Sequence, residues 1–253
     1  RKMRPAGPPL AHQVGHPGGD AVEAELTGLN AVYDRRTEDK LLDVVVSALE
    51  SGQAVGWMQG RMEFGPRALG ARSIIADPRS PDMQKKLNLK VKFRESFRPF
   101  APSVLRQHLS EWFDLEADSP YMLLVANVLE KHRIRDQKEA GTLWGIDMLN
   151  VPRSEIPAVT HLDYSARIQT VHEETNPRYA RLLEVFRSRT GCPVLVNTSF
   201  NVRGEPIVNT PSDAYRCFMG TDLDLLVIGD FVLEKTKQPV ESVSDYRKEY
   251  ELD

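Results

Sequence analysis

The stretch NPRYARLLEVFRSRTGCPVLVNTSFN (176–201) is the clearest indication of the fold. Residues 176–191 have the apolar spacing of an amphipathic helix, and Gly191 is a typical C-terminal stop. Residues 193–201 then predict a buried strand that runs into a polar loop. A helix followed directly by a buried strand is typical of an α/β domain.

The same alternation extends in both directions, but irregularly. Further helices are expected at 20–29, 38–51, 80–93, 106–113 and 212–220, and extended segments at 54–60, 97–105, 121–128, 166–171, 223–229 and 231–235. Residues 63–79 predict a turn, a short helix and a strand. This order, without an internal repeat, favours a mixed, twisted sheet flanked by helices.

The ends of the chain differ in composition from the middle. Residues 1–19 contain four Pro and four Gly and predict a linker or mobile arm, and the charged residues 241–253 predict a tail. One domain is expected over 20–240. Since the first residue is Arg1, we expect a piece of a longer protein or a chain whose first residues are missing.

The overall composition is that of a soluble globular protein. Hydrophobic residues make up 41% and charged residues 27% of the 253 residues. No apolar run reaches about 18 residues, so no membrane span is predicted. Cys192 and Cys217 have no nearby His pair, which argues against a zinc site and favours a reduced, cytoplasmic protein.

Positive charge is concentrated in one part of an acidic chain. The net charge is −3, yet residues 61–106 hold eleven Lys and Arg against four Asp and Glu, a local charge of +7. The rest of the chain therefore carries −10. A local basic zone of this kind favours a small anionic ligand, and guanidinium groups suit phosphate.

The motif EFGPRALGARS (63–73) opens the basic zone. Gly65 and the following Pro are expected to make a turn and open a helix, whose free N–H groups favour an anion. Arg67 and Arg72 would project nearby, and Gly70 would let a ligand or backbone come close. The alternative is a tight turn with two surface arginines.

The motif KFRESFRPFAPS (92–103) closes the zone. In an extended chain Lys92 and Arg94 share one face, since side chains alternate. With Arg98 close by, these cations repel one another unless an anion lies between them. The alternative is a solvated basic edge strand.

The motif LVNTSFNVRGEP (195–206) places polar side chains directly after a buried strand. They are Asn197, Thr198, Ser199, Asn201 and Arg203. So many hydroxyl and amide groups next to a core are costly unless they bind something. Phosphate oxygens, ribose hydroxyls or a carbamoyl group would serve, and capping of turns is the alternative.

The motif HLDYSARIQTV (161–171) contains Arg167 among apolar neighbours, where a guanidinium needs a partner. His161 and Asp163 form only a weak metal pattern, so a hydrogen-bonded loop histidine is favoured. No protein metal ligands are predicted.

Four blocks together resemble the C-terminal region of the NodU/CmcH-type O-carbamoyltransferases. They are FGPRALGARSI, FRPFAPSVL, ARIQTV and NTSFNVRGEPIV, which follow one another in the family order. The resemblance implies a YrdC-like fold with its K-x-R and S-x-N signatures, here Lys92-Phe93-Arg94 and Ser199-Phe200-Asn201. Tyr164 departs from the family pattern, which often has Gly there, and the first 50 residues match no known pattern.

The resemblance also implies an activity. Carbamoyl phosphate loses phosphate, and the resulting carbamate attacks the α-phosphorus of ATP to give carbamoyl adenylate and pyrophosphate. The catalytic residues would be Arg94, Arg98 and Arg167. The residues that bind nucleotide or carbamoyl phosphate would be Arg67, Arg72, Lys92, Asn197, Thr198, Ser199, Asn201 and Arg203. Mg²⁺ would accompany ATP with few protein ligands.

A partner domain is implied as well. In the family an actin-like domain, expected before residue 1, passes the carbamoyl group to a hydroxyl of an antibiotic or sugar. Two alternatives remain: a threonylcarbamoyl-AMP synthase-like enzyme, and an RNA-binding YrdC-like module. The charge of −10 outside the basic zone argues against an extended RNA surface.

Overall fold

The computed structural model describes residues 19–96, 98–134 and 151–239. The predicted arm at 1–19, except for Gly19, and the predicted tail at 241–253 therefore lie outside the described residues. Within the described ranges, no helix is long and apolar enough to cross a membrane.

The described strands form one open sheet in the order β1-β9-β8-β2-β3-β7-β4-β6-β5. The pairs β2–β8 and β4–β6 are parallel, and the other neighbours are antiparallel. The predicted α/β fold with a mixed sheet is confirmed. The strands are β1 (Asp34–Arg35), β2 (Val55–Met58), β3 (Arg72–Ala76), β4 (Ala101–Leu105), β5 (Leu124–Asn127), β6 (Ser165–Val171), β7 (Val194–Ser199), β8 (Leu225–Ile228) and β9 (Phe231–Glu234).

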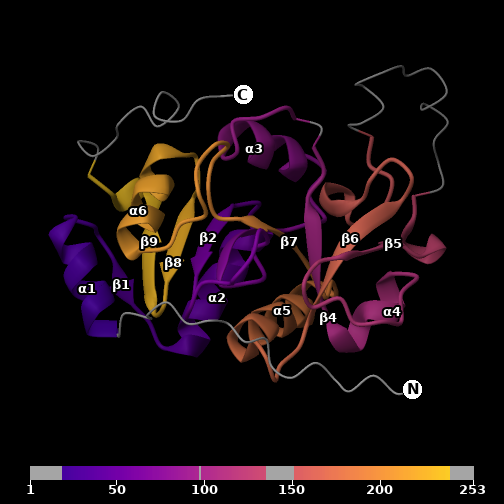
Figure 1. The fold of residues 1–253 in the computed structure, drawn as a ribbon, viewed down its shortest axis with the longest axis horizontal. Coiled ribbons are helices and arrows are strands. Elements are labelled where there is room, and N and C mark those ends of the chain that lie inside the picture. Colours follow the sequence, from indigo (N-terminus) through magenta and orange to yellow (C-terminus); the bar gives the residue numbers. More distant parts are fainter. Residues whose placement is uncertain (1–18, 97, 135–150, 240–253) are drawn as a thin grey trace.

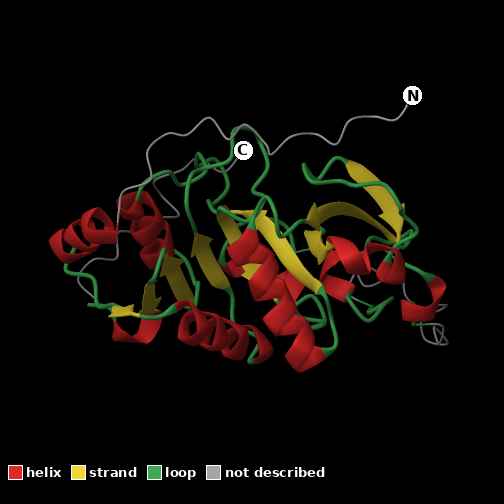
Figure 2. Cartoon of the chain, turned by 90° about the horizontal axis from the view of Figure 1, so that it is seen from below, coloured by secondary structure: helices red, strands yellow, loops and turns green. Residues whose placement is uncertain are grey.

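Helices flank this sheet (Figures 1 and 2). They are α1 (Gly19–Gly28), α2 (Glu38–Glu50), α3 (Met83–Lys90), α4 (Leu109–Trp112), α5 (Pro177–Thr190) and α6 (Pro211–Gly220). Helices α2 and α5 contact each other and strands β2, β4 and β7, whereas α6 contacts β2 and β8 and carries α1 on its outer side. Figure 1 shows α1, α6 and β9 at one end of the molecule and α4, β5 and β6 at the other.

Local sequence signals explain where the helices begin and end. The side chain of Asn176 accepts a hydrogen bond from Tyr179 N at 3.2 Å, and Pro177 occupies the first turn of α5. Gly191 ends that helix in the left-handed region, at φ 78°. Thr210 and Asp213 form a reciprocal capping box at the start of α6.

The central strands are buried, but the edge strand β5 is not. Every residue of β2, β3, β4 and β8 is buried, as expected for strands covered on both faces. In β5, by contrast, Leu124, Val125 and Asn127 are exposed.

Three local predictions are wrong. No helix follows Gly65, because the backbone N–H groups of Leu69 and Ala71 donate to the carboxylate of Glu63 instead of facing an anion. The chain at 92–96 is a turn after α3, neither the end of the helix predicted at 80–93 nor the extended chain expected to place Lys92 and Arg94 on one face, and Phe93 has φ 48°. Helix α3 also begins at Met83 and ends at Lys90, whereas the helix was predicted at 80–93.

Candidate anion-binding site

Lys92 joins two of the predicted motifs. It follows α3, and its ammonium group lies at the end of β7, 2.8 Å from both Asn201 O and Asn201 Oδ1 and 3.2 Å from Ser199 Oγ. It also contacts Ser199 O. Ser199 Oγ donates to Asn201 Oδ1 at 2.7 Å, which completes the cluster. The K-x-R lysine and the S-x-N residues, more than 100 positions apart in sequence, thus meet directly.

Burial changes the acidity of this lysine. Lys92 is buried, with only 4% of the residue exposed. Desolvation, with a further contribution from the charge of Arg94, lowers the pKa of Lys92 to about 7. A lysine that gains or loses its proton near neutral pH can respond to the arrival of a phosphate group.

Three arginines lie around the lysine cluster. Burial, together with the charges of Arg98 and Arg203, lowers the pKa of Arg94 to about 10. Arg94 Nε donates to Asn88 Oδ1 at 2.6 Å, and its guanidinium lies over the Phe100 ring, 5.0 Å from the centroid. These contacts fix the Arg94 side chain.

Two carboxylates lie near these cations: Glu205 acts on the charge of Lys92, and Glu95 lies among the arginines. Arg98 Nε is 2.9 Å from Glu95 Oε2, and Arg203 Nη1 is 3.9 Å from Glu95 Oε1. Glu95 accepts a hydrogen bond from its own backbone amide, which, with both arginines, lowers its pKa. Around Lys92, Arg94, Arg98 and Arg203 the cations therefore outnumber the carboxylates, which favours anion binding.

A row of polar side chains crosses one face of the sheet. Asn197 Nδ2 donates to Gln169 Oε1 at 2.8 Å and lies 3.0 Å from Ser103 Oγ. These residues come from the neighbouring strands β7, β6 and β4. Because side chains alternate along a strand, Arg167 on β6 and Ser199 on β7 share this face.

Arg167 on β6 and Arg67 form a second pair of cations. Burial, with the charge of exposed Arg67, lowers the pKa of Arg167. Arg167 Nε is buried without a hydrogen-bond partner in the described part of the chain. Burial also lowers the pKa of His161. Asp163 accepts hydrogen bonds from Ser165 N and Oγ, which places it in a loop cap.

Two of the predicted residues do not join the site through their side chains. Arg72 is 2% exposed, and its guanidinium donates to the carbonyls of Gln59, Gly60 and Asn209 at 3.2, 3.1 and 3.3 Å. The Arg72 side chain therefore holds these backbone segments together instead of projecting beside Arg67. Thr198 lies on the opposite face of β7 from its two neighbours, because successive side chains alternate.

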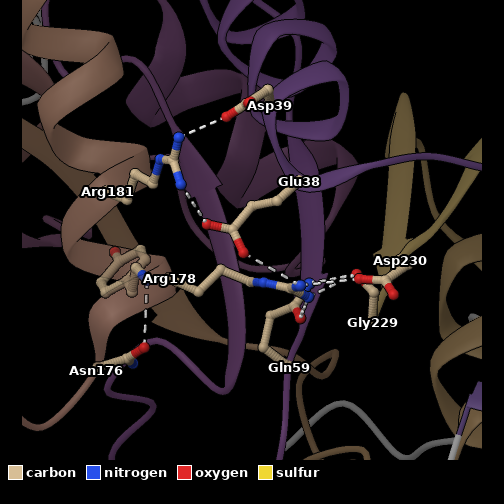
Figure 3. Close-up of polar contacts among 9 residues, drawn as sticks. Glu38, Asp39, Gln59, Asn176, Arg178, Arg181, Gly229 and Asp230 are labelled. Carbon is tan, nitrogen blue, oxygen red and sulfur yellow. Dashed lines mark hydrogen bonds and ion pairs between the residues drawn. The ribbon is translucent and has the colours of Figure 1, made fainter.

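A cavity lies beside the loop 61–71, and Glu63 and Gln169 are among the residues that line it. Its volume is about 690 Å³, and none of the predicted binding residues lines it. At its wall, Arg178 donates to Gln59 Oε1 at 2.9 Å and to Asp230 Oδ1 at 2.8 Å, and Glu38 connects Arg178 with Arg181 (Figure 3). Because these arginines are paired with carboxylates, the network ties α5 to α2 and to the β8–β9 turn.

Two further polar residues, half-buried Glu63 and buried Gln169, were not selected from the sequence. Glu63 accepts backbone hydrogen bonds at 2.7 and 2.6 Å, and Gln169 donates to Leu69 O at 2.8 Å. Gln169 had a visible signal, since an amide stands in the buried strand ARIQTV. Among the described residues, no group of three His, Cys, Asp or Glu could hold a metal ion.

Comparisons with known proteins match this chain to one family. A family model described as "Carbamoyltransferase C-terminus" matches residues 46–235. The protein sll1178 of Synechocystis is 57% identical over 237 residues, which cover 92% of this chain and 38% of that protein.

The 3′-hydroxymethylcephem-O-carbamoyltransferase of Streptomyces clavuligerus is 36% identical over 81% of this chain and 36% of that enzyme. Among solved structures, full-length HypF in its phosphate- and nucleotide-bound form aligns with a TM-score of 0.43 and 15% identity, over 80% of this chain and 22% of that one. The chain thus spans well under half the length of these proteins.

Proposed function

Because this chain belongs to the carbamoyltransferase C-terminus family, we propose that it binds ATP and carbamoyl phosphate and forms carbamoyl adenylate. The observation that supports this proposal is the contact of Lys92 with Ser199 and Asn201 inside a group of three arginines. A site that handles two phosphorylated substrates needs more cations than a structural ion pair does.

The lysine cluster would hold the nucleotide. Lys92 and Arg94 would contact the phosphates of ATP, and Ser199 and Asn201 would orient the nucleotide or the carbamoyl group. Among the described residues, the Lys92 ammonium group donates to neutral oxygens of Ser199 and Asn201. A phosphate oxygen can replace such a contact by a hydrogen bond in which both donor and acceptor are charged.

The arginine pair would receive carbamoyl phosphate. Arg67 and Arg167 influence each other electrostatically, and neither forms an ion pair with a carboxylate among the described residues. A phosphate dianion between them would remove their repulsion. Arg98 and Arg203 would neutralise the charge that develops during transfer, and they would give up their contacts with Glu95 to do so.

The chemistry needs positioning and charge more than a covalent nucleophile. Water first cleaves carbamoyl phosphate to carbamate and phosphate. A carbamate oxygen then attacks the α-phosphorus of ATP, the bond to the β-phosphate bridging oxygen breaks, and pyrophosphate leaves. Cations around the phosphates stabilise both steps. Mg²⁺ would be held mainly by the triphosphate and water.

Transfer of the carbamoyl group to a hydroxyl is assigned to the part of the protein that this chain does not span. The Streptomyces clavuligerus relative is an O-carbamoyltransferase of which this chain covers 36%. We propose that an adjoining domain uses the adenylate to carbamoylate a natural product.

Pyrophosphate release tests the proposal. With ATP and Mg²⁺, release should require carbamoyl phosphate and should stop with Lys92→Met. Release that requires threonine and bicarbonate would instead indicate threonylcarbamoyl-AMP synthesis. Tight RNA binding with a steep salt dependence, and no pyrophosphate release, would indicate an RNA-binding module. Carbamoylation of an alcohol by this chain alone would contradict the division of labour.

A further inference from the structure

The loop that carries Arg67 has no regular structure of its own. Residues 61–71, which we call the arginine loop, contain neither helix nor strand. We propose, on the basis of the function proposed above, that Gln169, Asn197 and Glu63 are positioning residues that fix this loop and hold Arg67 opposite Arg167 for the phosphate group of carbamoyl phosphate.

Two amides hold consecutive carbonyls of the loop. Asn197 Nδ2 donates to Ala68 O at 3.1 Å, and Gln169 Nε2 donates to Leu69 O at 2.8 Å. Both amides are buried, with residue exposures of 1% and 3%. The two carbonyls come directly after Arg67, so these contacts fix the backbone on which the Arg67 side chain is mounted.

The orientation of the Gln169 amide is itself fixed. Ser103 Oγ donates to Gln169 Oε1 at 2.6 Å, and Asn197 Nδ2 donates to the same oxygen at 2.8 Å. With two donors on its oxygen, the amide must point its nitrogen at the loop. Strand register produces this arrangement, since Ser103 pairs with Gln169 and neighbouring β7 supplies Asn197.

The amide groups of the loop are held from the other side. Glu63 Oε1 accepts hydrogen bonds from Leu69 N and Ala71 N. Trp57 Nε1 donates to Gly70 O at 3.0 Å, and Gly70 N donates to a serine of β3 at 3.0 Å. The backbone around Leu69 and Gly70 is therefore held at both its carbonyls and its N–H groups by side chains.

Such restraint is needed because two like charges are brought together. Burial, with a further contribution from the charge of Arg67, lowers the pKa of Arg167, so the two cations lie within electrostatic reach of each other. Arg67 is exposed and would move into solvent if its loop were free. Holding it in place before the ligand arrives removes the ordering cost from binding.

A double-mutant cycle on phosphate affinity tests the inference. Inorganic phosphate is titrated calorimetrically into the unmodified chain, Gln169→Met, Arg67→Ala and the double variant. We expect each single variant to weaken binding about tenfold, on the order of 1.4 kcal/mol. The double variant should be no weaker than Arg67→Ala alone, because Gln169 acts through Arg67. Equal weakening by Gln169→Met in both backgrounds, or no phosphate binding by the unmodified chain, would overturn the inference.

Gln238 offers a matched control. It is a buried glutamine whose amide holds the backbone of Val32 at 3.0 and 2.8 Å, beside β9 and thus at the other end of the sheet from β6. Gln238→Met should lower stability in the same way as Gln169→Met but leave phosphate affinity unchanged. If Gln169→Met does not fold, Glu63→Ala should weaken binding, and Glu63→Gln, which keeps the accepting oxygen, should restore it.

The readouts separate this inference from the proposed function. Coupling between Gln169 and Arg67 in phosphate binding, without any carbamoyl-phosphate-dependent pyrophosphate release, would support the positioning role and refute the reaction. Carbamoyl-phosphate-dependent release with no such coupling would do the reverse. If both hold, Gln169→Met should raise the KM for carbamoyl phosphate about tenfold and leave the KM for ATP unchanged, since Lys92 is not held by Gln169.

Discussion

The affinity for ATP should fall steeply as the pH rises above neutrality, because Lys92 loses its proton. With a pKa of about 7, about half of the free molecules carry the ammonium group at pH 7 and about 3% at pH 8.5. A bound phosphate favours the charged form and raises this pKa. Affinity should therefore decrease about 15-fold between pH 7 and 8.5 and change little below pH 6.

Calorimetry can count the proton directly. ATP saturated with Mg²⁺ keeps its triphosphate fully ionised across this range, so the titrating group belongs to the protein. Titrations in buffers of different ionisation enthalpy should show an uptake of about 0.5 proton at pH 7, rising toward 1 at pH 8.5 and falling toward zero below pH 6. The positive sign follows because the free protein has lost a proton that the complex retains.

Two variants locate the proton. Lys92→Arg should take up none, since a guanidinium stays charged at these pH values. Lys235 is a second buried lysine, with a pKa lowered to about 8 by desolvation, but it binds backbone carbonyls such as Thr221 O at 2.8 Å instead of the site. Lys235→Arg should behave like the unmodified chain. Undiminished uptake in Lys92→Arg, or an affinity independent of pH, would refute the reasoning.

Substitutions at three further residues give separate tests. Arg94→Ala should weaken ATP binding by about 1.5–3 kcal/mol, or roughly ten- to a hundredfold. Arg94→Lys should not restore the affinity, because a single ammonium group cannot replace the two parallel hydrogen bonds of a guanidinium group. Calorimetric titration measures both effects. Glu95→Gln frees Arg98 from an exposed ion pair 2.9 Å long, so phosphate should bind about two- to fivefold more tightly, and weaker binding would contradict this role. Gly70→Ala should lower the free energy of unfolding by about 2–5 kcal/mol, because φ is +105° and the new Cβ would lie 2.8 Å from Tyr179 Cγ. An unchanged denaturation midpoint would show that the Tyr179 ring can move away.

Local chemistry explains why most elements could be predicted from the sequence. Pro177 and Gly191 mark the ends of α5, and an apolar run marks β7. The predicted helix after Gly65 failed for a reason that lies outside its own residues. The backbone N–H and C=O groups of this segment form hydrogen bonds with Glu63 and with side chains from four strands. The helix propensity of a local segment does not take such distant partners into account.

The polar and charged residues of the site could be identified in the sequence, but the contacts that each one makes could not. Lys92 and Asn201 could be matched by motif, and the structure brings them together. Asn197 was predicted to bind a ligand, yet its amide holds Ala68 O, which depends on the register of β7 against β4. Arg72 was expected beside Arg67, but its place on β3 directs it to four backbone carbonyls. Register and long-range pairing are not encoded in a single segment.

The pairing of β2 with β8 has a consequence for synthesis on the ribosome. Strand β2 lies between β3 and β8, and the contact Ala54–Asp224 at its start joins residues 170 positions apart. At ~5–20 residues per second, roughly 10–30 s pass between the synthesis of these two segments. During that interval the apolar edge of β2 has no parallel partner. The nascent chain must therefore be kept from aggregating until nearly the whole sheet has been made, and a stop codon before β8 should yield an insoluble product.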